Sequence, residues 1–219
     1  MTELRVSPRV LLVTDPAFAD ETILRCVDAA AAALPPGAFG VQLRDKRRPV
    51  ASLRMLALGL RVVTRKHGAW LVVNGDAGLA RDVGADGVHL GRGAGDVASA
   101  RATFGRRTWI SVAAHSDDEA RRAVDDGADA ALVSPIFPTR PPSPTAAPKR
   151  ERGLHALRAA RAAVGSRVRL YALGGVTPER VPGCAAAGAY GVAVLRALLE
   201  SSSPAAVARA LHDALPARW

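Results

Sequence analysis

Short apolar runs alternate along the chain with longer stretches that have the composition of amphipathic helices. The runs occupy residues 10–14, 39–43, 70–73, 87–90, 109–113, 130–133, 171–173 and 191–195. The early stretches between them are rich in Ala, Leu and Val, and each stops at a Pro or Gly, as at 17–34, 50–67 and 77–83. This alternation is typical of parallel strand–helix units. With eight runs, the sequence predicts an α/β fold, a closed (β/α)8 TIM barrel.

An open, doubly wound sheet is the alternative arrangement of the same units. Its dinucleotide-binding form carries G-x-G-x-x-G directly after the first strand, whereas here the first run ends at Asp15 and Pro16. Internal repetition also favours the barrel, since Gly-Ala-Asp precedes the fourth and sixth runs and Gly-Ala-Tyr precedes the eighth. Each glycine is well placed to end a helix in a left-handed conformation. We therefore expect one domain over residues 1–219.

The stretch from Tyr171 to Leu195 is a candidate phosphate site. Its first apolar run stops at Gly174 and Gly175, a helix follows, and a second apolar run leads to Leu195. Glycine tolerates positive φ and lets backbone N–H groups approach an anion. The loops after strands seven and eight of a TIM barrel often bind phosphate. The sequence predicts this role for the end of the barrel.

Polar residues also follow the other predicted strands, and in a parallel barrel they face one shared mouth. His115 is the candidate for proton transfer because imidazole titrates near neutral pH, with a helix cap or loop residue as the alternative. His89 lies within a strand, where a structural role is expected. Arg44 and Lys46 alternate along an extended segment and either bind an anion together or are solvated, as we expect of Arg47 and Arg48.

The composition of the chain limits the classes of partner that we expect it to bind. The net charge is +10, but the arginines are spread over several predicted helices and are not interleaved with aromatic residues, which make up only 4% of the chain. This distribution argues against nucleic acid and favours a small anionic substrate. Cys26 and Cys184 fall in the first and seventh helices, which do not adjoin in a barrel, so we expect reduced thiols. No apolar run is long enough to span a membrane, and the N-terminus lacks the apolar core of a signal peptide, so we expect a cytoplasmic protein without membrane contact.

A proline-rich segment at 137–150 departs from the regular rhythm and is too long for a minimal strand–helix connection. Two interpretations remain open: a lid over the mouth, or an insertion without fixed structure.

Several segments together resemble the thiamine phosphate synthase and TenI (thiazole tautomerase) superfamily. They are VQLRDK (41–46), VNGDAGLA (73–80), GADGVHLG (84–91), SVAAHS (111–116), SPIFPT (134–139), ALGGVTPERV (172–181) and GVAV (191–194). The resemblance covers nearly the whole chain in order and spacing. It implies a (β/α)8 barrel that handles the phosphorylated thiazole of thiamine biosynthesis.

Several departures from the synthase pattern indicate which branch of the superfamily the chain resembles. The resemblance implies that a synthase uses Mg²⁺ and has an Asp after the third-strand Asn and another after H-L-G, where this chain has Gly75 and Ala94. Asp76 and Asp96 are nearby but shifted, and Mg²⁺ prefers oxygen ligands such as carboxylates. The P-T-x-T-K segment that follows strand six in synthases reads PTRPP at 138–142. These departures place the chain closer to the TenI branch.

Our leading hypothesis is therefore a thiazole tautomerase-like isomerase that needs no metal or other cofactor, in which His115 transfers the proton of thiazole carboxylate phosphate. The alternatives are a thiamine phosphate synthase, which would use Mg²⁺, and a non-catalytic barrel that binds a pathway ligand as a regulator. The expected partner is a phosphorylated thiazole, and association into a homo-oligomer is left open. The predicted substrate-binding residues are Arg44, Lys46, Asn74, Ser134 and Thr139, and the predicted phosphate-binding residues are Gly174, Gly175, Leu195 and Arg196, the last in place of a family serine.

Overall fold

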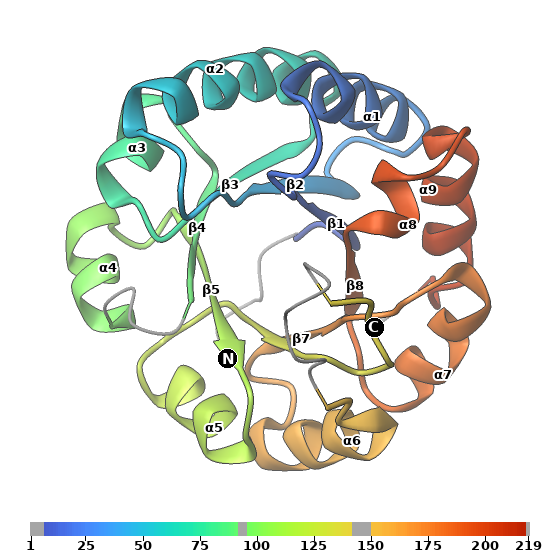
Figure 1. Cartoon of the computed structure of the whole chain (residues 1–219). Coiled ribbons are helices and arrows are strands. Elements are labelled where there is room, and N and C mark those ends of the chain that lie inside the picture. The colour runs from blue at the N-terminus through green and yellow to red at the C-terminus, as the bar shows by residue number, and fades with distance from the viewer. Residues whose placement is uncertain (1–6, 92–95, 142–149, 218–219) are drawn as a thin grey trace.

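The computed structural model describes residues 7–91, 96–141 and 150–217, apart from the side chain of Asp117. Within these residues, parallel strands close into a barrel in the order β1 to β8, and β8 pairs back onto β1 (Figure 1). The strands are Val10–Val13 (β1), Phe39–Leu43 (β2), Trp70–Asn74 (β3), Gly87–Leu90 (β4), Trp109–Ala114 (β5), Ala130–Val133 (β6), Arg169–Leu173 (β7) and Gly191–Val194 (β8). The predicted TIM barrel is confirmed.

Helices surround the strands as an outer ring (Figure 1). They are Asp20–Ala32 (α1), Val50–His67 (α2), Ala77–Asp82 (α3), Val97–Phe104 (α4), Asp117–Asp125 (α5), Gly153–Val164 (α6), Pro178–Arg180 (η1, a 3₁₀ turn), Val181–Ala186 (α7), Arg196–Leu199 (α8) and Pro204–Asp213 (α9). None of the described helices is long and apolar enough to cross a membrane. The glycines that end three of the predicted helices have positive φ, as expected: Gly84, Gly127 and Gly188.

The sequence located most strands to within a residue, and the exceptions have physical causes. Strand β7 begins at Arg169, two residues before the apolar run, because this arginine is buried inside the barrel. Its guanidinium donates to Ser7 Oγ and lies 4.8 Å from the centre of the Tyr190 ring. Helix α4 was not predicted, since only Val97 of its residues is buried and its apolar pattern is weak.

Two apolar layers hold the barrel together. Outward-facing strand residues pack under the helices, while a second cluster that includes Leu11, Trp109 and Tyr171 fills the interior. The Trp109 and Tyr171 rings meet edge to face at 6.0 Å. Tyr171 donates to the carbonyl of Pro8, so the N-terminal segment closes the barrel below this cluster. The aromatic cluster and the buried Arg169–Ser7 pair therefore fill the end of the interior where the strands begin.

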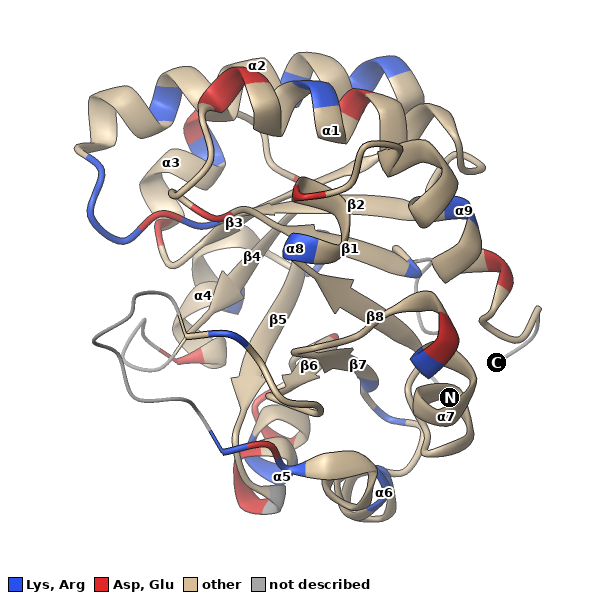
Figure 2. Cartoon of the chain, turned by 45° about the vertical axis from the view of Figure 1, so that its right-hand side comes forward, with Lys and Arg blue, Asp and Glu red and all other residues tan. Residues whose placement is uncertain are grey.

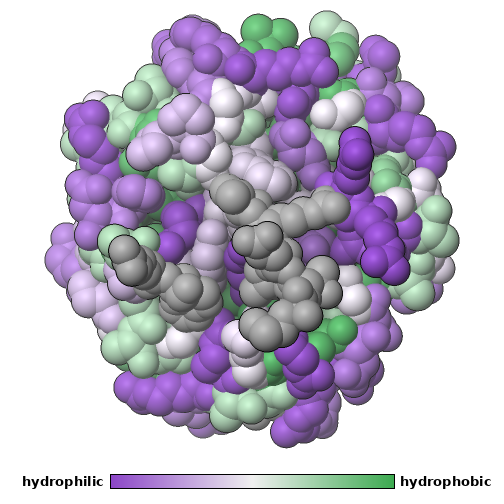
Figure 3. Space-filling view, turned by 180° about the vertical axis from the view of Figure 1, so that it is seen from behind, coloured by the Kyte–Doolittle hydropathy of each residue, from purple (hydrophilic) through white to green (hydrophobic). Residues whose placement is uncertain are grey.

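Charged residues are distributed over the helices and loops (Figure 2), and the rear face shows hydrophilic residues with separate apolar patches among them (Figure 3). Arg48 corrects the expectation of a solvated side chain: it pairs with Asp20 at 2.7 Å and with Asp45 at 3.2 Å.

The two cysteines are free and buried as predicted, and burial raises the pKa of both Cys26 and Cys184 to about 11. Neither thiol is suited to act as a nucleophile.

Candidate active site

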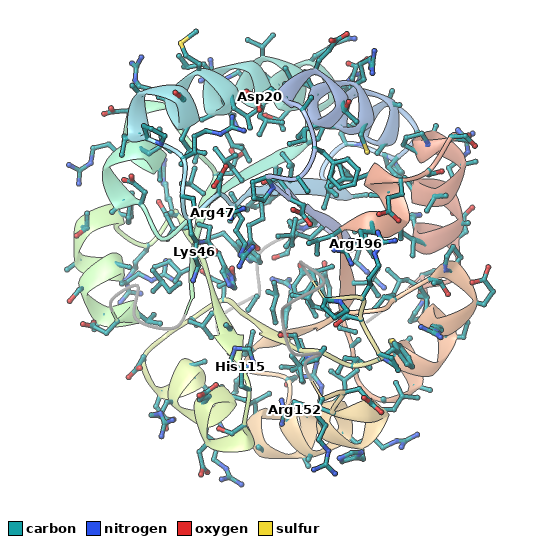
Figure 4. All side chains as sticks on the ribbon, viewed as in Figure 1. Asp20, Lys46, Arg47, His115, Arg152 and Arg196 are labelled. Carbon is teal, nitrogen blue, oxygen red and sulfur yellow. The ribbon has the colours of Figure 1, made fainter. Side chains whose placement is uncertain are left out.

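The C-terminal ends of the strands form a mouth with basic side chains around it. Figure 4 shows Lys46 and Arg196 on opposite sides of the opening, with His115 between them around the rim. Lys46 follows β2, His115 follows β5, and Arg196 begins α8 directly after β8. The structure thus brings these residues of the sequence prediction to one end of the barrel, as parallel strands require.

The floor of the mouth is a band of polar side chains on neighbouring strands. Gln42 on β2 donates to Asn74 Oδ1 on β3 at 3.2 Å, and His89 on β4 hydrogen-bonds to Ser111 on β5 at 2.9 Å. Asn74 is in register with His89, and His89 with Ser111. The Oε1 atom of Gln42 is buried and has no hydrogen-bond partner among the described residues. A buried acceptor without a partner is costly, so the floor is suited to a ligand that brings an N–H or O–H donor.

Sequence reasoning missed Gln42 and Ser111. Both are polar residues inside otherwise apolar strands, which was the available signal. A single polar residue in a buried strand does not reveal whether it faces the mouth or pairs with a neighbour, because that depends on strand register.

His89 is uncharged at neutral pH. Burial, together with the smaller effect of the positive charges of Arg44, Lys46 and His115, lowers its pKa to about 3. The Nδ1 atom of this neutral ring is hydrogen-bonded to the Ser111 hydroxyl. His89 is therefore a fixed, uncharged polar group of the floor. The cations that lower its pKa make the mouth around it positively charged.

His115 is held at the rim by the start of α5. Its backbone N–H donates to Glu119 Oε2 at 2.6 Å, while Ser116 caps the helix by accepting from the Glu119 N–H at 3.1 Å. The cap is thus Ser116, not His115. The ring of His115 is half-buried, and its Nδ1 lies 3.3 Å from the Ser134 carbonyl oxygen. When Nδ1 carries the proton and donates it to that carbonyl, Nε2 is left to accept a proton from a ligand.

Arg44 and Lys46 are positioned by the end of β1. Thr14 Oγ1 accepts from the Arg44 N–H at 2.8 Å and donates to the Arg44 carbonyl at 3.1 Å, which anchors the segment. The intervening Asp45 is turned toward the backbone of Arg47 and Arg48 and accepts from both N–H groups. Within the described part of the chain, Arg44 and Lys46 form no ion pair, so both cations are available to an anionic ligand.

The Gly174–Gly175 turn has the backbone that the sequence predicted, with φ of 99° and 63°. Its lack of side chains also has a packing reason that the sequence did not reveal. A Cβ on Gly174 would lie 2.7 Å from Pro135 Cβ, and one on Gly175 would lie 2.6 Å from the Pro138 carbonyl oxygen. Residues 134–141, which we call the β6 segment, therefore lie directly on this turn. Thr139 is half-buried within the β6 segment.

Beyond residue 141, most of the proline-rich stretch lies outside the described residues, at 142–149. Its interpretation as a lid or as an insertion without fixed structure therefore stays a prediction.

The carboxylates at the mouth do not fit a divalent cation. Asp76 and Asp96 cap the helices that follow them: Asp76 accepts from the Leu79 N–H at 2.8 Å, and Asp96 accepts from the N–H and the hydroxyl of Ser99. Across the described ranges, no three His, Cys, Asp or Glu side chains are grouped so as to hold a metal ion. The sequence of the undescribed stretches 92–95 and 142–149 contains none of these four residue types. The two shifted acids are therefore used to start helices.

A comparison with protein-family models gives a match to the TMP-TENI family, described as thiamine monophosphate synthase, over residues 10–198. The chain belongs to this family. It is 39% identical to a thiamine-phosphate synthase from Moorella thermoacetica over 181 residues, which are 83% of this chain and 84% of that protein. It is 41% identical to the thiamine-phosphate synthase from Halorhodospira halophila over 188 residues, or 84% and 86% of the two chains.

Solved structures agree on the fold of the TMP-TENI family. A thiamine phosphate pyrophosphorylase from Pyrococcus furiosus superimposes with a TM-score of 0.82, at 24% identity and 97% coverage of both chains. A 3-hexulose-6-phosphate synthase superimposes with a TM-score of 0.68 at 20% identity, covering 95% of this chain and all of that one. The expected closeness to the TenI branch is not supported, because these curated relatives carry the synthase name. The chain is thus a TMP-TENI barrel of thiamine biosynthesis.

Proposed function

We propose that this chain is a thiamine-phosphate synthase, the alternative of our sequence hypotheses. It would join hydroxymethylpyrimidine diphosphate to thiazole phosphate and release pyrophosphate. The names of its curated relatives support this assignment. The observation in the structure that carries it is the separation of two basic ends across the mouth, at Lys46 and Arg196 (Figure 4). Two anionic substrates that must react side by side need two cationic positions with a polar floor between them.

In this proposal each end has its own task. Arg44 and Lys46 bind the diphosphate, while Gly174, Gly175, Leu195 and Arg196 bind the thiazole phosphate. Asn74, Ser134 and Thr139 contact the rings. In the reaction the thiazole nitrogen forms a bond to the pyrimidine methylene carbon, and the bond from that carbon to the diphosphate oxygen breaks. The diphosphate leaves with the electron pair, so cations near that oxygen stabilise the transition state.

Mg²⁺ is implied by the synthase family, and the mouth of this chain does not suit it, because Asp76 and Asp96 are helix caps. The charge of the leaving diphosphate is met in this proposal by Arg44 and Lys46, which have no competing carboxylate in the described structure.

The test is to supply both substrates to the purified protein and to measure thiamine phosphate and pyrophosphate, with and without a chelator. We expect both products in equal amounts. A folded protein that makes neither product under either condition would refute the proposed function.

Thiazole tautomerisation is a second candidate, favoured by the placement of His115. Its ring stands on the rim with Nδ1 directed to the Ser134 carbonyl, which leaves Nε2 able to move a proton. A positioned general acid or base typically contributes about 10²–10⁴ in rate. We therefore expect His115→Ala to slow any tautomerase activity by about that factor and to alter thiamine phosphate formation much less. Unchanged tautomerase turnover in this variant would eliminate His115 as the proton carrier.

A further inference from the structure

Two arginines from separate loops contact the same carboxylate beside the predicted phosphate site. Arg140 of the β6 segment pairs with Glu200, which follows α8. Arg196 has its Nε 3.8 Å from the same Glu200 oxygen and donates through Nη1 to the Arg140 carbonyl at 2.9 Å. Arg140 and Arg196, the arginine pair, thus share one negative charge between two positive charges.

The arginine pair lies where the phosphate is expected. The β6 segment is bonded to the end of β7, since Ile136 N–H donates to the Leu173 carbonyl and Phe137 N–H to the Gly174 carbonyl. Arg180 secures the same contact, with its guanidinium 4.7 Å from the centre of the Phe137 ring and a hydrogen bond to the Gly175 carbonyl. The β6 segment therefore extends from the glycine turn to the start of α8, the two elements predicted to bind phosphate.

The ion pairs that Glu200 forms with these two arginines are weak. The side chains of Arg140, Glu200 and Arg196 are 64%, 43% and 27% exposed, so water screens their attraction. Ion pairs with this exposure contribute little to stability. A phosphate monoester brings up to two charges and three terminal oxygens, which match the forked donors of two guanidinium groups better than one carboxylate does.

We propose that Arg140 and Arg196 together bind the phosphate of the substrate, and that Glu200 is the internal counter-ion which the phosphate displaces. This inference rests on the proposed function for the identity of the ligand, a phosphorylated thiazole. It assigns a phosphate ligand, Arg140, at the variable position of the P-T-x-T-K pattern, and it gives Glu200 the role of a competitor.

The sign of two substitutions separates this proposal from a purely structural ion pair. If Glu200 competes with phosphate, Glu200→Gln tightens phosphate binding, whereas Arg140→Gln weakens it. If Glu200 only holds the arginines in place, both substitutions weaken binding. Glutamine keeps the shape of glutamate, so the change is one of charge.

The experiment is calorimetric titration of the full chain with thiazole phosphate, and separately with inorganic phosphate. We expect Arg140→Gln to raise Kd about tenfold, as for loss of a charge-assisted hydrogen bond, and Glu200→Gln to lower Kd about threefold, as for loss of an exposed ion pair. Matched controls are Arg121→Gln and Asp118→Asn, which remove the same charges from an exposed ion pair on α5. The controls should leave Kd within about twofold, and circular dichroism should show all variants folded.

Opposite signs for the two variants, with unchanged controls, support the proposal. Weaker binding in both, no change in either, equal changes in the controls, or a wild-type chain that binds neither ligand would overturn it. Failure of the proposed function gives a different result: phosphate binds with the opposite signs, yet no thiamine phosphate forms. Conversely, thiamine phosphate formation without these binding changes leaves the synthase assignment intact and removes the roles of Arg140 and Glu200.

Discussion

Replacement of Gly175 by alanine tests how the glycine turn and the β6 segment depend on each other. Gly175 has φ of 63°, so alanine there must adopt a left-handed conformation that costs about 1–2 kcal/mol. The new Cβ would also lie 2.6 Å from the Pro138 carbonyl oxygen and 2.8 Å from Phe137 Cβ. Neither atom is the end of a flexible side chain, so the β6 segment itself must shift. Overpacking of this kind adds about 1–3 kcal/mol, which gives a total loss of about 2–5 kcal/mol.

Gly84 provides a matched control. Its φ is 59°, close to that of Gly175, and it ends α3 in a turn where the Ala85 N–H donates to the Ala80 carbonyl. A Cβ on Gly84 would meet only Arg65 Nη2 at 3.7 Å, an ordinary contact with the end of a flexible side chain. Gly84→Ala therefore carries the backbone cost alone, about 1–2 kcal/mol. The difference between the two variants isolates the contact with the β6 segment.

The assay is urea denaturation followed by circular dichroism, with the free energy of unfolding compared among wild type, Gly84→Ala and Gly175→Ala. We expect Gly175→Ala to be less stable than Gly84→Ala by at least about 1 kcal/mol and to bind thiazole phosphate more weakly. Equal losses in the two variants would show that the β6 segment does not press on the turn, and the packing argument would fail.

Three further results are expected. Lys46→Met should weaken the binding of inorganic pyrophosphate about tenfold, measured in the presence of a chelator. The control Lys66→Met, which removes an exposed lysine paired with Asp28, should leave this binding unchanged. Pyrophosphate binding that requires added Mg²⁺ would contradict the role of Lys46. Because the pKa of His89 is about 3 in the folded chain and about 6.5 when unfolded, the unfolded chain alone takes up this proton between those values. The contribution of His89 to the free energy of unfolding is fully present above pH 6.5 and decreases as the pH falls toward 3, by at most about 1.4 kcal/mol per pH unit. In denaturation curves of His89→Gln this part of the pH dependence should be missing. The same pH dependence in His89→Gln and wild type would argue against a lowered pKa of His89. Thiol reagents should label Cys26 and Cys184 only after denaturation, since both are buried with a pKa of about 11; rapid labelling of the native chain would contradict that burial.

The residues at the mouth show how much of the site the local sequence pattern can predict. Asn74 and His115 were identified as residues of the mouth because each follows an apolar run, and parallel strands bring such positions to one end. The same argument does not identify Gln42 or Ser111, which lie within strands and become part of the floor only through the register of β2 to β5. Nor does it reveal that Asp76 and Asp96 cap the helices that follow them.

The sequence by itself determined the eight strands, their alternation with helices and the positive-φ glycines that end helices, because burial and backbone conformation are imposed on each segment locally. Only the tertiary structure decided which charges meet. Arg140 and Glu200 are 60 residues apart, and Arg169 enters the barrel to reach Ser7 across 162 residues. Such contacts depend on closure of the barrel and on the exact path of its loops, which no local periodicity records. The same holds for Gly174 and Gly175, whose sequence indicated a phosphate turn and whose packing against the β6 segment appears only once strands β6 and β7 are paired.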